Sequence, residues 1–280
     1  MEQREKRARR YEQILLLGCD VNQDVIGQSA ETEKDRCQRS DTIIVLSLDK
    51  GTGKIKMIDL MRDTWVPIPG HGMGKLNAPV VYGGPELAVK VINDSFDLCI
   101  RKYAQITIND LVDLIDLFGG VDIDLSIYEA IYINAWMPDV KIVTERNDDV
   151  PRIMADGMNR LNGMQTLAHV RNRTVGNIND RENRGNDVLK AMARRARDEM
   201  SQRERLRFAL QARKYVRTDL NVRDIVRLLR FGRHIDPDTI EVYHAPAEGT
   251  YEVKNDRIWR METDFEKAGK KIWEFIEKAK

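Results

Sequence analysis

Short runs of apolar residues mark the positions of several strands along the chain. Continuous apolar runs at residues 14–18, 42–48 and 55–60 predict three buried strands. A Gly-bearing turn at residues 50–54 links the second and third runs into a hairpin. An alternating pattern predicts another strand at residues 121–125, and a late strand follows at 239–243.

Apolar positions spaced three and four apart indicate helices between these strands. Pro85 suits a first helical position, and Asn109 and Asn162 suit N-caps. The predicted helices cover residues 85–97, 109–118, 162–169, 188–215 and 265–276. This alternation favours one α/β domain over residues 12–280, an α-β-α sandwich with a mixed central sheet and helices on both faces. A basic segment, residues 1–11, precedes it.

Charge and hydropathy narrow the class of protein. The formal net charge is +1, so the protein as a whole lacks the excess of positive charge that is typical of nucleic-acid-binding proteins. Residues 181–217 hold 12 Lys/Arg and 5 Asp/Glu, either as a solvated helix face or as a surface that meets an anion. The sequence contains no apolar run of membrane-spanning length, and residues 1–10 lack the apolar core of a signal peptide. The protein is therefore cytoplasmic, or an N-terminal anchor is missing from this chain.

The three cysteines are Cys19, Cys37 and Cys99. This odd, sparse set is no disulfide framework, although a Cys19–Cys37 bridge is possible in an exported chain. There is no Cys/His pattern with the spacing of zinc ligands.

Polar residues gather where the first three predicted strands end or begin. If the first two strands are antiparallel neighbours, one edge of the sheet brings together Asp20, Arg39, Asp41, Arg62 and Asp63. Carboxylates suit Mg²⁺, and arginine forks suit phosphate because each bonds two oxygens. Each residue alone reads as an ordinary strand end, but the five together predict a metal–phosphate site.

A second basic group follows the short helix near residue 169. Arg171 and Arg173 point to the same side of an extended segment, and Arg181 and Arg184 share a face where a helix begins. Arginine at a helix N-terminus opposes the helix dipole, which an intervening anion would explain. The alternative is a set of surface arginines on an ion-paired helix. His169 lies on an apolar turn and is expected to pack in the interior.

Five motifs in fixed order resemble those of the LytR-CpsA-Psr family. They are ILLLGCD at residues 14–20, RSDT at 39–42, LMRD at 60–63, KLNAPVVYGG at 75–84 and LNGMQTLAHVRNR at 161–173. The resemblance runs from about residue 12 to residue 190, and a weaker likeness around 246–251 extends it to the C-terminus. It implies a mixed-sheet α/β sandwich with an apolar pocket for a polyprenyl tail.

The resemblance also implies roles for individual residues. Asp20 and Asp41 match carboxylates that place Mg²⁺. The positions that match pyrophosphate-binding or neighbouring polar residues are Arg39, Arg62, Lys75, Arg171, Arg173, Arg181 and Arg184. Arg62, Asp63 and Asp180 are the expected catalytic residues, with Asp63 or Asp180 as the proton acceptor. Gly185 stands where the family usually carries Gln, and the transmembrane anchor that normally precedes the first motif is absent.

The resemblance implies a Mg²⁺-dependent phosphotransferase. The expected donor is an undecaprenyl-pyrophosphate-linked glycopolymer, such as a teichoic acid or capsular polysaccharide, and the expected acceptor is a peptidoglycan sugar hydroxyl. Such an enzyme works at the membrane surface, extracytoplasmically, anchored in its full-length form. Two alternatives remain, a non-catalytic binder of polyprenyl phosphate or glycopolymer and a nucleic-acid-binding regulator. Net charge argues against the second, and no nucleic acid partner is expected.

Overall fold

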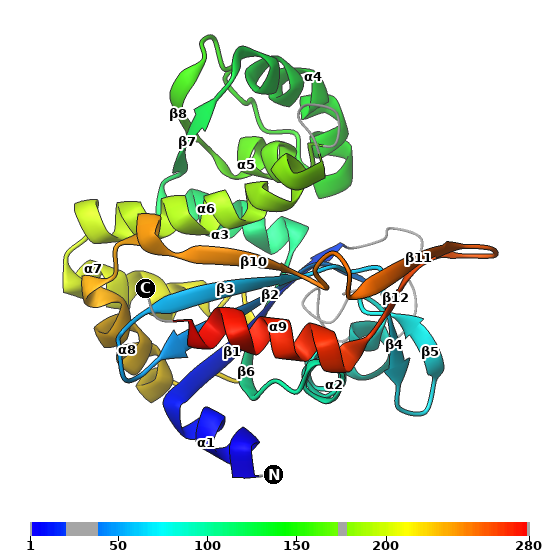
Figure 1. The fold of residues 1–280 in the computed structure, drawn as a ribbon. Coiled ribbons are helices and arrows are strands. Elements are labelled where there is room, and N and C mark those ends of the chain that lie inside the picture. The colour runs from blue at the N-terminus through cyan, green and yellow to red at the C-terminus, as the bar shows by residue number, and fades with distance from the viewer. Residues whose placement is uncertain (1, 21–38, 173–177, 279–280) are drawn as a thin grey trace. The chain divides into compact units, whose positions relative to one another are not determined.

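The computed structural model describes residues 2–20, 39–172 and 178–278, except the side chains of residues 178–182 and 234. The chain divides into two compact units (Figure 1). Unit 1 comprises Met1–Thr107, Arg217–Asn221 and Ile240–Lys280, and unit 2 comprises Ile108–Val216 and Val222–Thr239. Each unit mixes helices and strands, so the predicted α/β class is confirmed. The single-domain boundary at residue 12 stays a prediction.

A six-stranded mixed sheet forms the centre of unit 1. Its strand order is β10 (Glu241–Ala245), β3 (Ile55–Leu60), β2 (Arg39–Asp49), β1 (Tyr11–Asp20), β6 (Ile100–Thr107) and β9 (Arg217–Thr218). β2 is antiparallel to both β1 and β3, while β1 is parallel to β6 and β10 is parallel to β3. The predicted hairpin and the assumed antiparallel pairing of the first two strands are therefore both confirmed.

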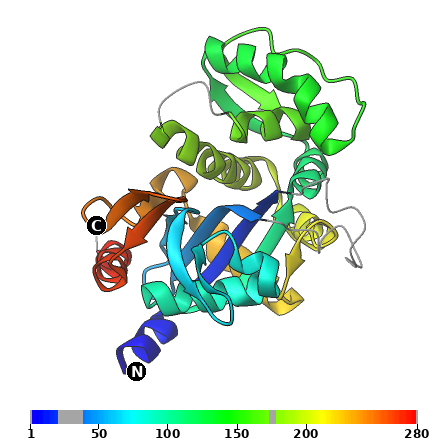
Figure 2. The same cartoon turned by 90° about the vertical axis from the view of Figure 1, so that its right-hand side faces the viewer.

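Two helices cover one face of this sheet. α2 (Pro79–Phe96) and α9 (Phe265–Glu277) contact each other and lie on the same side of the strands (Figures 1 and 2). Their apolar sides share one core cluster with the strands, in which Leu15, Phe96 and Trp273 are at most 1% exposed. α2 begins earlier than predicted and is kinked at Gly83 and Gly84, after which Pro85 restarts it. The short helix α1 (Glu2–Arg10) leads into β1.

A second, four-stranded sheet belongs to unit 1. Its order is β11 (Tyr251–Asn255), β12 (Trp259–Thr263), β4 (Thr64–Ile68) and β5 (Gly72–Lys75). β12 is parallel to β4, and the backbone N–H of Met261 donates to the carbonyl of Asp63 at 3.1 Å. The sequence pattern does not predict these four strands, because Gly and Pro interrupt β4 and β5 and β11 and β12 each contain two charged residues.

Unit 2 is mainly helical and contains one two-stranded antiparallel sheet. β7 (Val121–Leu125) pairs with β8 (Gly157–Leu161), and the helices are α3 (Ile108–Phe118), α4 (Ile127–Thr144), α5 (Gly163–Val170), α6 (Ile178–Glu199), α7 (Gln202–Ala212) and α8 (Val222–Phe231). Two 3-10 turns, Gly232–His234 and Pro237–Thr239, follow α8. Among the described residues, no helix combines the length and apolar character needed to cross a bilayer.

The predicted long helix at residues 188–215 is wrong in its extent. α6 begins ten residues earlier, at Ile178, and ends at Glu199. Ser201 interrupts the helical run because its side chain accepts from the N–H of Glu204, whose carboxylate in turn accepts from the N–H of Ser201. This capping box starts α7 as a separate helix.

Candidate functional site

A β-bulge sets the position of Asp41. In the β1–β2 ladder Gly18 pairs with Thr42 and Cys19 pairs with Ser40, so Asp41 has no partner on β1. A Cβ on Gly18 would lie 3.0 Å from Cβ of Thr42, so glycine allows the strands to approach closely here. A bulge bends its strand and redirects the extra side chain. Asp41 is thereby taken out of the regular alternation of β2.

Asp41, Arg62, Asp63 and Lys75 form a continuous ionic group, which we call the unit 1 cluster. Arg62 Nη1 lies 2.5 Å from Asp41 Oδ2, and Arg62 Nε lies 3.4 Å from Asp63 Oδ2. Lys75 Nζ donates to the other oxygen of Asp63 at 2.5 Å. The four side chains are 21–32% exposed, so the group is open to a ligand but partly shielded from water. Its two cations balance its two carboxylates.

The backbone of Asn77 ties this group together. Its N–H donates to the carbonyl of Arg62 at 3.2 Å, and its carbonyl accepts from the N–H of Ser40 at 3.4 Å. Its side-chain amide lies 3.5 Å from Asp41 Oδ1, the limit for a hydrogen bond. The segment between β5 and α2 therefore connects the end of β3 to the bulge in β2. Asn77 was not among the predicted site residues, although it lies inside the KLNAPVVYGG motif.

Asp20 and Arg39 lie at the same end of the sheet. They are Cα partners at the last position of the β1–β2 ladder, two residues from Asp41, as the convergence argument predicted. Among the described residues, no three His, Cys, Asp or Glu side chains form a group that could hold a metal. Mg²⁺ needs only one or two carboxylates, with water and phosphate oxygens completing its shell. Asp20 and Asp41 fit that requirement chemically.

In unit 2, α5 ends just before Arg171, the first residue of the second basic group predicted from the sequence. Asn162 caps the helix with a reciprocal capping box to Gln165, as the sequence predicted. Arg171 is the C-cap, and its guanidinium carbon lies 5.9 Å from the centre of the Trp136 ring. α5 thus delivers Arg171 next to an aromatic side chain of α4.

Arg184 occupies an interior position. It is 3% exposed, its Nη1 donates to the carbonyl of Asn172 at 2.9 Å, and its Nη2 lies 3.4 Å from Glu129 Oε1. These contacts hold the backbone immediately after Arg171 against α4 and α6. The predicted role of Arg184 in pyrophosphate binding stays a prediction, and the structure gives it a positioning role for the arginine segment.

Burial and charge act together on Glu129 and His169. Burial tends to raise the pKa of Glu129, but hydrogen bonds from the N–H and hydroxyl of Ser126 and the nearby positive charge bring the pKa below its ordinary value. Burial, opposed by the charge of Glu129 and aided by that of Arg184, lowers the pKa of His169 to about 4. His169 is 3% exposed, which confirms the expected packing role. The sequence signature Ser126-x-x-Glu129 would have revealed the capping carboxylate.

Several predicted site residues, or their side chains, lie outside the part of the chain that the structure describes. Arg173 lies outside the described residues, and so does Cys37, the expected partner of the disulfide-bonded Cys19. Asp180 and Arg181 lie in the first turn of α6, and their side chains are outside the description. Arg62 belongs to unit 1 and Arg171 to unit 2, so their meeting at one pyrophosphate stays a prediction.

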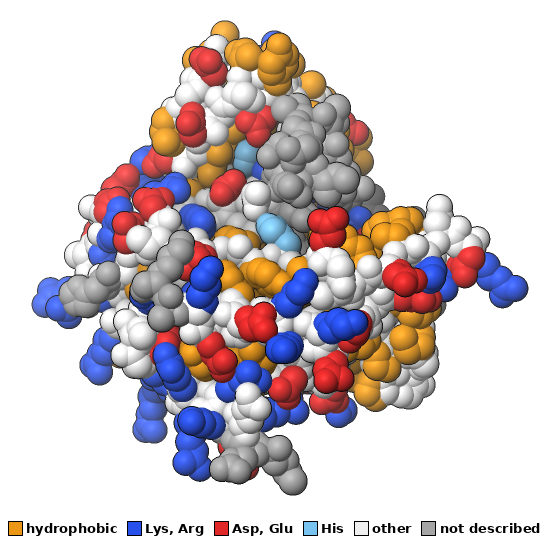
Figure 3. Space-filling view, in the orientation of Figure 1, with side chains coloured by type: hydrophobic (Ala, Val, Ile, Leu, Met, Phe, Trp, Pro, Cys, Tyr) orange, Lys and Arg blue, Asp and Glu red, His pale blue; other side chains and the backbone are white. Residues whose placement is uncertain are grey.

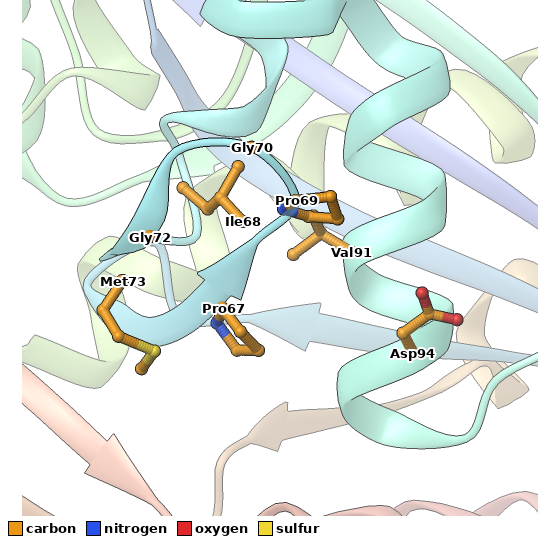
Figure 4. A pocket seen from close by; sticks show the side chains of 8 residues that line it. All are labelled: Pro67, Ile68, Pro69, Gly70, Gly72, Met73, Val91 and Asp94. Carbon is orange, nitrogen blue, oxygen red and sulfur yellow. The ribbon is translucent and has the colours of Figure 1, made fainter.

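An open pocket of about 460 Å³ lies between the β4–β5 hairpin and α2 (Figure 4). Its lining is apolar apart from Asp94, which pairs with Lys90, so it offers no cation to a phosphate. The apolar side of α2 is packed in the core of unit 1 through Ala88, Ile92 and Phe96. This side of α2 contacts α9 and strands of unit 1.

Known proteins are similar to this chain over parts of its length or over most of it. The profile of the LytR_cpsA_psr family matches residues 2–272. The polyisoprenyl-teichoic acid–peptidoglycan teichoic acid transferase TagU of Oceanobacillus iheyensis is 36% identical over 117 residues, 40% of this chain and 33% of that protein. Biofilm regulatory protein A of Streptococcus mutans is 27% identical over 248 residues, 85% of this chain and 57% of that protein. The chain thus spans between a third and somewhat over half of these curated relatives.

Solved structures show the same fold. The crystal structure of TagV from Bacillus subtilis superimposes with a TM-score of 0.71 at 22% identity, covering 97% of this chain and 99% of that one. The family protein TagT with bound octaprenyl pyrophosphate lipid gives a TM-score of 0.63 at 19% identity, covering 97% and 92%. At identities of 22% and 19%, these similarities show a shared fold and nothing more.

Proposed function

The chain belongs to the LytR-CpsA-Psr family, and from this we propose that it is a phosphotransferase that moves a glycopolymer from a polyprenyl pyrophosphate carrier onto peptidoglycan. The observation that carries the proposal is the unit 1 cluster, which draws on three motifs of the family resemblance, RSDT, LMRD and KLNAPVVYGG. TagU, the relative from O. iheyensis, is named for transfer of teichoic acid to peptidoglycan.

Arg62 is suited to receive a phosphate. Two of its nitrogens, Nη1 and Nε, contact Asp41 and Asp63, which fixes the plane of the guanidinium. Among the described residues, none accepts a hydrogen bond from Nη2 of Arg62. The N–H groups of Nη2 can therefore donate to an anion. Lys75 adds a second positive charge beside it.

The proposed reaction is a single phosphoryl transfer. A sugar hydroxyl oxygen of peptidoglycan forms a bond to the phosphorus that carries the glycopolymer, and the bond from that phosphorus to the bridging oxygen breaks. Polyprenyl phosphate leaves with the bridging oxygen, and the hydroxyl proton passes to a carboxylate. Positioning and charge stabilisation supply most of the catalysis in such transfers. Arg62, Lys75, Arg171, Arg173 and Arg181 are the cations proposed to neutralise the pyrophosphate.

Mg²⁺ held by Asp20 and Asp41 would supply further positive charge at the phosphate oxygens. For the proton acceptor, Asp63 and Asp180 remain the candidates. Oδ1 of Asp63 accepts from Lys75 and Oδ2 accepts from Arg62, and each carboxylate oxygen keeps a further lone pair that can take a proton. We place the reaction outside the cell, at the membrane surface where the lipid carrier resides.

The test is binding of geranylgeranyl pyrophosphate by calorimetry, with and without Mg²⁺. We expect Mg²⁺ to strengthen binding by the parent and Asp41→Asn to lose most of that gain, about tenfold in Kd. Arg171→Lys should weaken binding at either Mg²⁺ level, because one ammonium cannot form the two-oxygen fork. Asp59→Asn is the matched control, since Asp59 is a partly buried carboxylate of β3 that lies 3.7 Å from His244.

Equal Mg²⁺ dependence in Asp41→Asn and the parent would remove Asp41 from the metal site. If the parent fails to bind the pyrophosphate at all, the proposed donor is wrong. A turnover assay with a lipid-linked glycopolymer separates the enzyme from a non-catalytic binder, which would bind the donor and release no polyprenyl phosphate.

A further inference from the structure

The β11–β12 hairpin carries an exposed tryptophan. Trp259 is 43% exposed, and its neighbours Ile258 and Val253 are 50% and 52% exposed. Figure 3 shows hydrophobic surface among acidic and basic side chains on the part of the molecule formed by this hairpin. A large aromatic side chain left in water on an ordered strand is an informative departure from ordinary burial.

Trp259 borders the unit 1 cluster. Lys75 Nζ lies 5.8 Å from the centre of the Trp259 ring while it bonds Asp63. The hairpin is fixed there, because Met261, two residues further along β12, donates its N–H to the carbonyl of Asp63. Residues two apart in a strand share a face, so the indole is held in place by the same backbone that holds the ionic group.

The face of the hairpin that carries Trp259 also carries an amide. Asn255 of β11 is the direct cross-strand partner of Trp259, and opposite side chains of an antiparallel pair lie side by side on one face. On the other face, Arg260 pairs with Asp256 and Glu262 and lies over the Trp65 ring, so its groups are already engaged. Trp259 and Asn255 thus combine an open aromatic ring with an exposed hydrogen-bonding group.

We propose that Trp259 and Asn255 form a pyranose-binding subsite next to the phosphate-binding cluster. A pyranose has an apolar face of C–H groups and a rim of hydroxyls, which match an indole ring and an amide. The inference rests on the proposed function, in which two sugars approach the transferred phosphate. One is the first sugar of the donor, covalently joined to that phosphate, and the other is the acceptor sugar that attacks it.

A lipid surface is the competing occupant of an exposed apolar hairpin. Residues 251–263 contain three acidic side chains and three basic ones, so the hairpin has no net charge to attract anionic headgroups. The contact of Trp259 with Lys75 also places the ring at the ionic cluster, where a sugar linked to phosphate must lie. These two observations favour the sugar.

The experiment compares three probes by calorimetry on the full chain. The donor arm measures farnesyl pyrophosphate against farnesyl-pyrophosphoryl-N-acetylglucosamine, and the acceptor arm measures chitotetraose. We expect Trp259→Ala to weaken the sugar-bearing donor or the chitotetraose by about threefold to tenfold while farnesyl pyrophosphate binds as in the parent. Trp259→Phe should retain most of the affinity, because it keeps an aromatic ring. Ile258→Ala, an equally exposed neighbour in the turn, should bind all three probes like the parent.

Each result decides the proposal. Loss confined to one arm identifies whether the sugar belongs to the donor or the acceptor. Equal weakening of all probes would show that Trp259 acts only through Lys75, and unchanged affinity in both arms would exclude the subsite. Parent protein that binds farnesyl pyrophosphate without any sugar preference would overturn this inference and leave the proposed function standing, whereas no binding of any probe would overturn both. Vesicle sedimentation that drops with Trp259→Ala while sugar binding does not would assign the hairpin to the membrane.

Discussion

At the scale of single residues, opposite charges in the unit 1 cluster restrain one another. Arg62 is held by Asp41 and Asp63, and Lys75 by Asp63, so the cations have defined positions without a bound anion. Side chains fixed in this way lose less freedom when a ligand arrives. These four residues were predicted from the sequence, but which carboxylate oxygen contacts which cation depends on how separate strands align, and the sequence pattern does not specify that.

His169 makes the stability of unit 2 depend on pH. Burial lowers the pKa of His169 to about 4 in the folded protein, against an ordinary histidine pKa of 6.5. The folded state therefore binds fewer protons than the unfolded state below about pH 6.5, and stability falls as pH drops towards 4. The loss from this residue approaches about 3 kcal/mol. Urea unfolding from pH 7 to pH 4 measures it.

The variant His169→Phe should show a flatter stability curve over this range, because Phe does not titrate. His71→Gln serves as the control, since His71 is exposed and stacks on Tyr82. If His169→Phe keeps the slope of the parent, the pH dependence comes from other groups, such as Glu129.

At the scale of elements, α5 is fixed to α3 by one close approach. A Cβ built on Gly163, the first residue of α5, would lie 2.2 Å from the carbonyl oxygen of Val112. The carbonyl of Val112 belongs to the backbone of α3 and cannot move aside as the tip of a flexible side chain can. Only glycine therefore fits where α5 crosses α3. The position of Arg171 at the far end of α5 depends on this contact.

We expect Gly163→Ala to destabilise unit 2 by roughly 1–3 kcal/mol, because α5 must move away from α3. Gly185→Ala is the matched control, a helical glycine of α6 with no atom within 4 Å of its added Cβ. It should stabilise the protein by about 0.5–1 kcal/mol through helix propensity. Urea midpoints of the two variants should shift in opposite directions, and a shift of both in the same direction would refute this account of the crossing.

Elements with strong local signals were predictable, and those fixed by distant contacts were not. β3 and β7 lie at their predicted residues, and Asn162 caps α5 as predicted, whereas Pro85 follows a kink inside α2 and does not begin it. The strands β11 and β12 carry charged residues at alternate positions, and β12 pairs with β4, which lies almost 200 residues earlier. The bulge at Asp41 likewise depends on how β1 and β2 align, which periodicity alone does not specify.

At the scale of the molecule, the last helix closes the core of unit 1. Trp273 of α9 is 1% exposed and lies 5.6 Å from the ring of Tyr11, with Arg7 stacked on its face. Its indole N–H donates to the carbonyl of Asp97 at 2.9 Å. One side chain therefore joins the first strand, the end of α2 and the C-terminal helix.

We expect Trp273→Ala to destabilise unit 1 by about 3–5 kcal/mol, because it leaves a large cavity and an unpaired carbonyl. Trp259→Ala removes the same atoms from an exposed position and should change stability by less than about 0.5 kcal/mol. Thermal unfolding of both variants provides the comparison, and similar transition temperatures would contradict the central role of Trp273.

The bulge in β2 means that this strand is one residue longer than its ladder requires. Deleting Asp41 would let Ser40 and Thr42 pair in a regular register with β1, so the sheet itself would tolerate a shorter strand. The carboxylate that we propose for Mg²⁺ would then be lost while the fold remained. Strand length at this point is therefore a signature that can be read in an alignment. A related chain that lacks one residue here should still fold, but its arginine at the end of β3 would have lost its carboxylate partner.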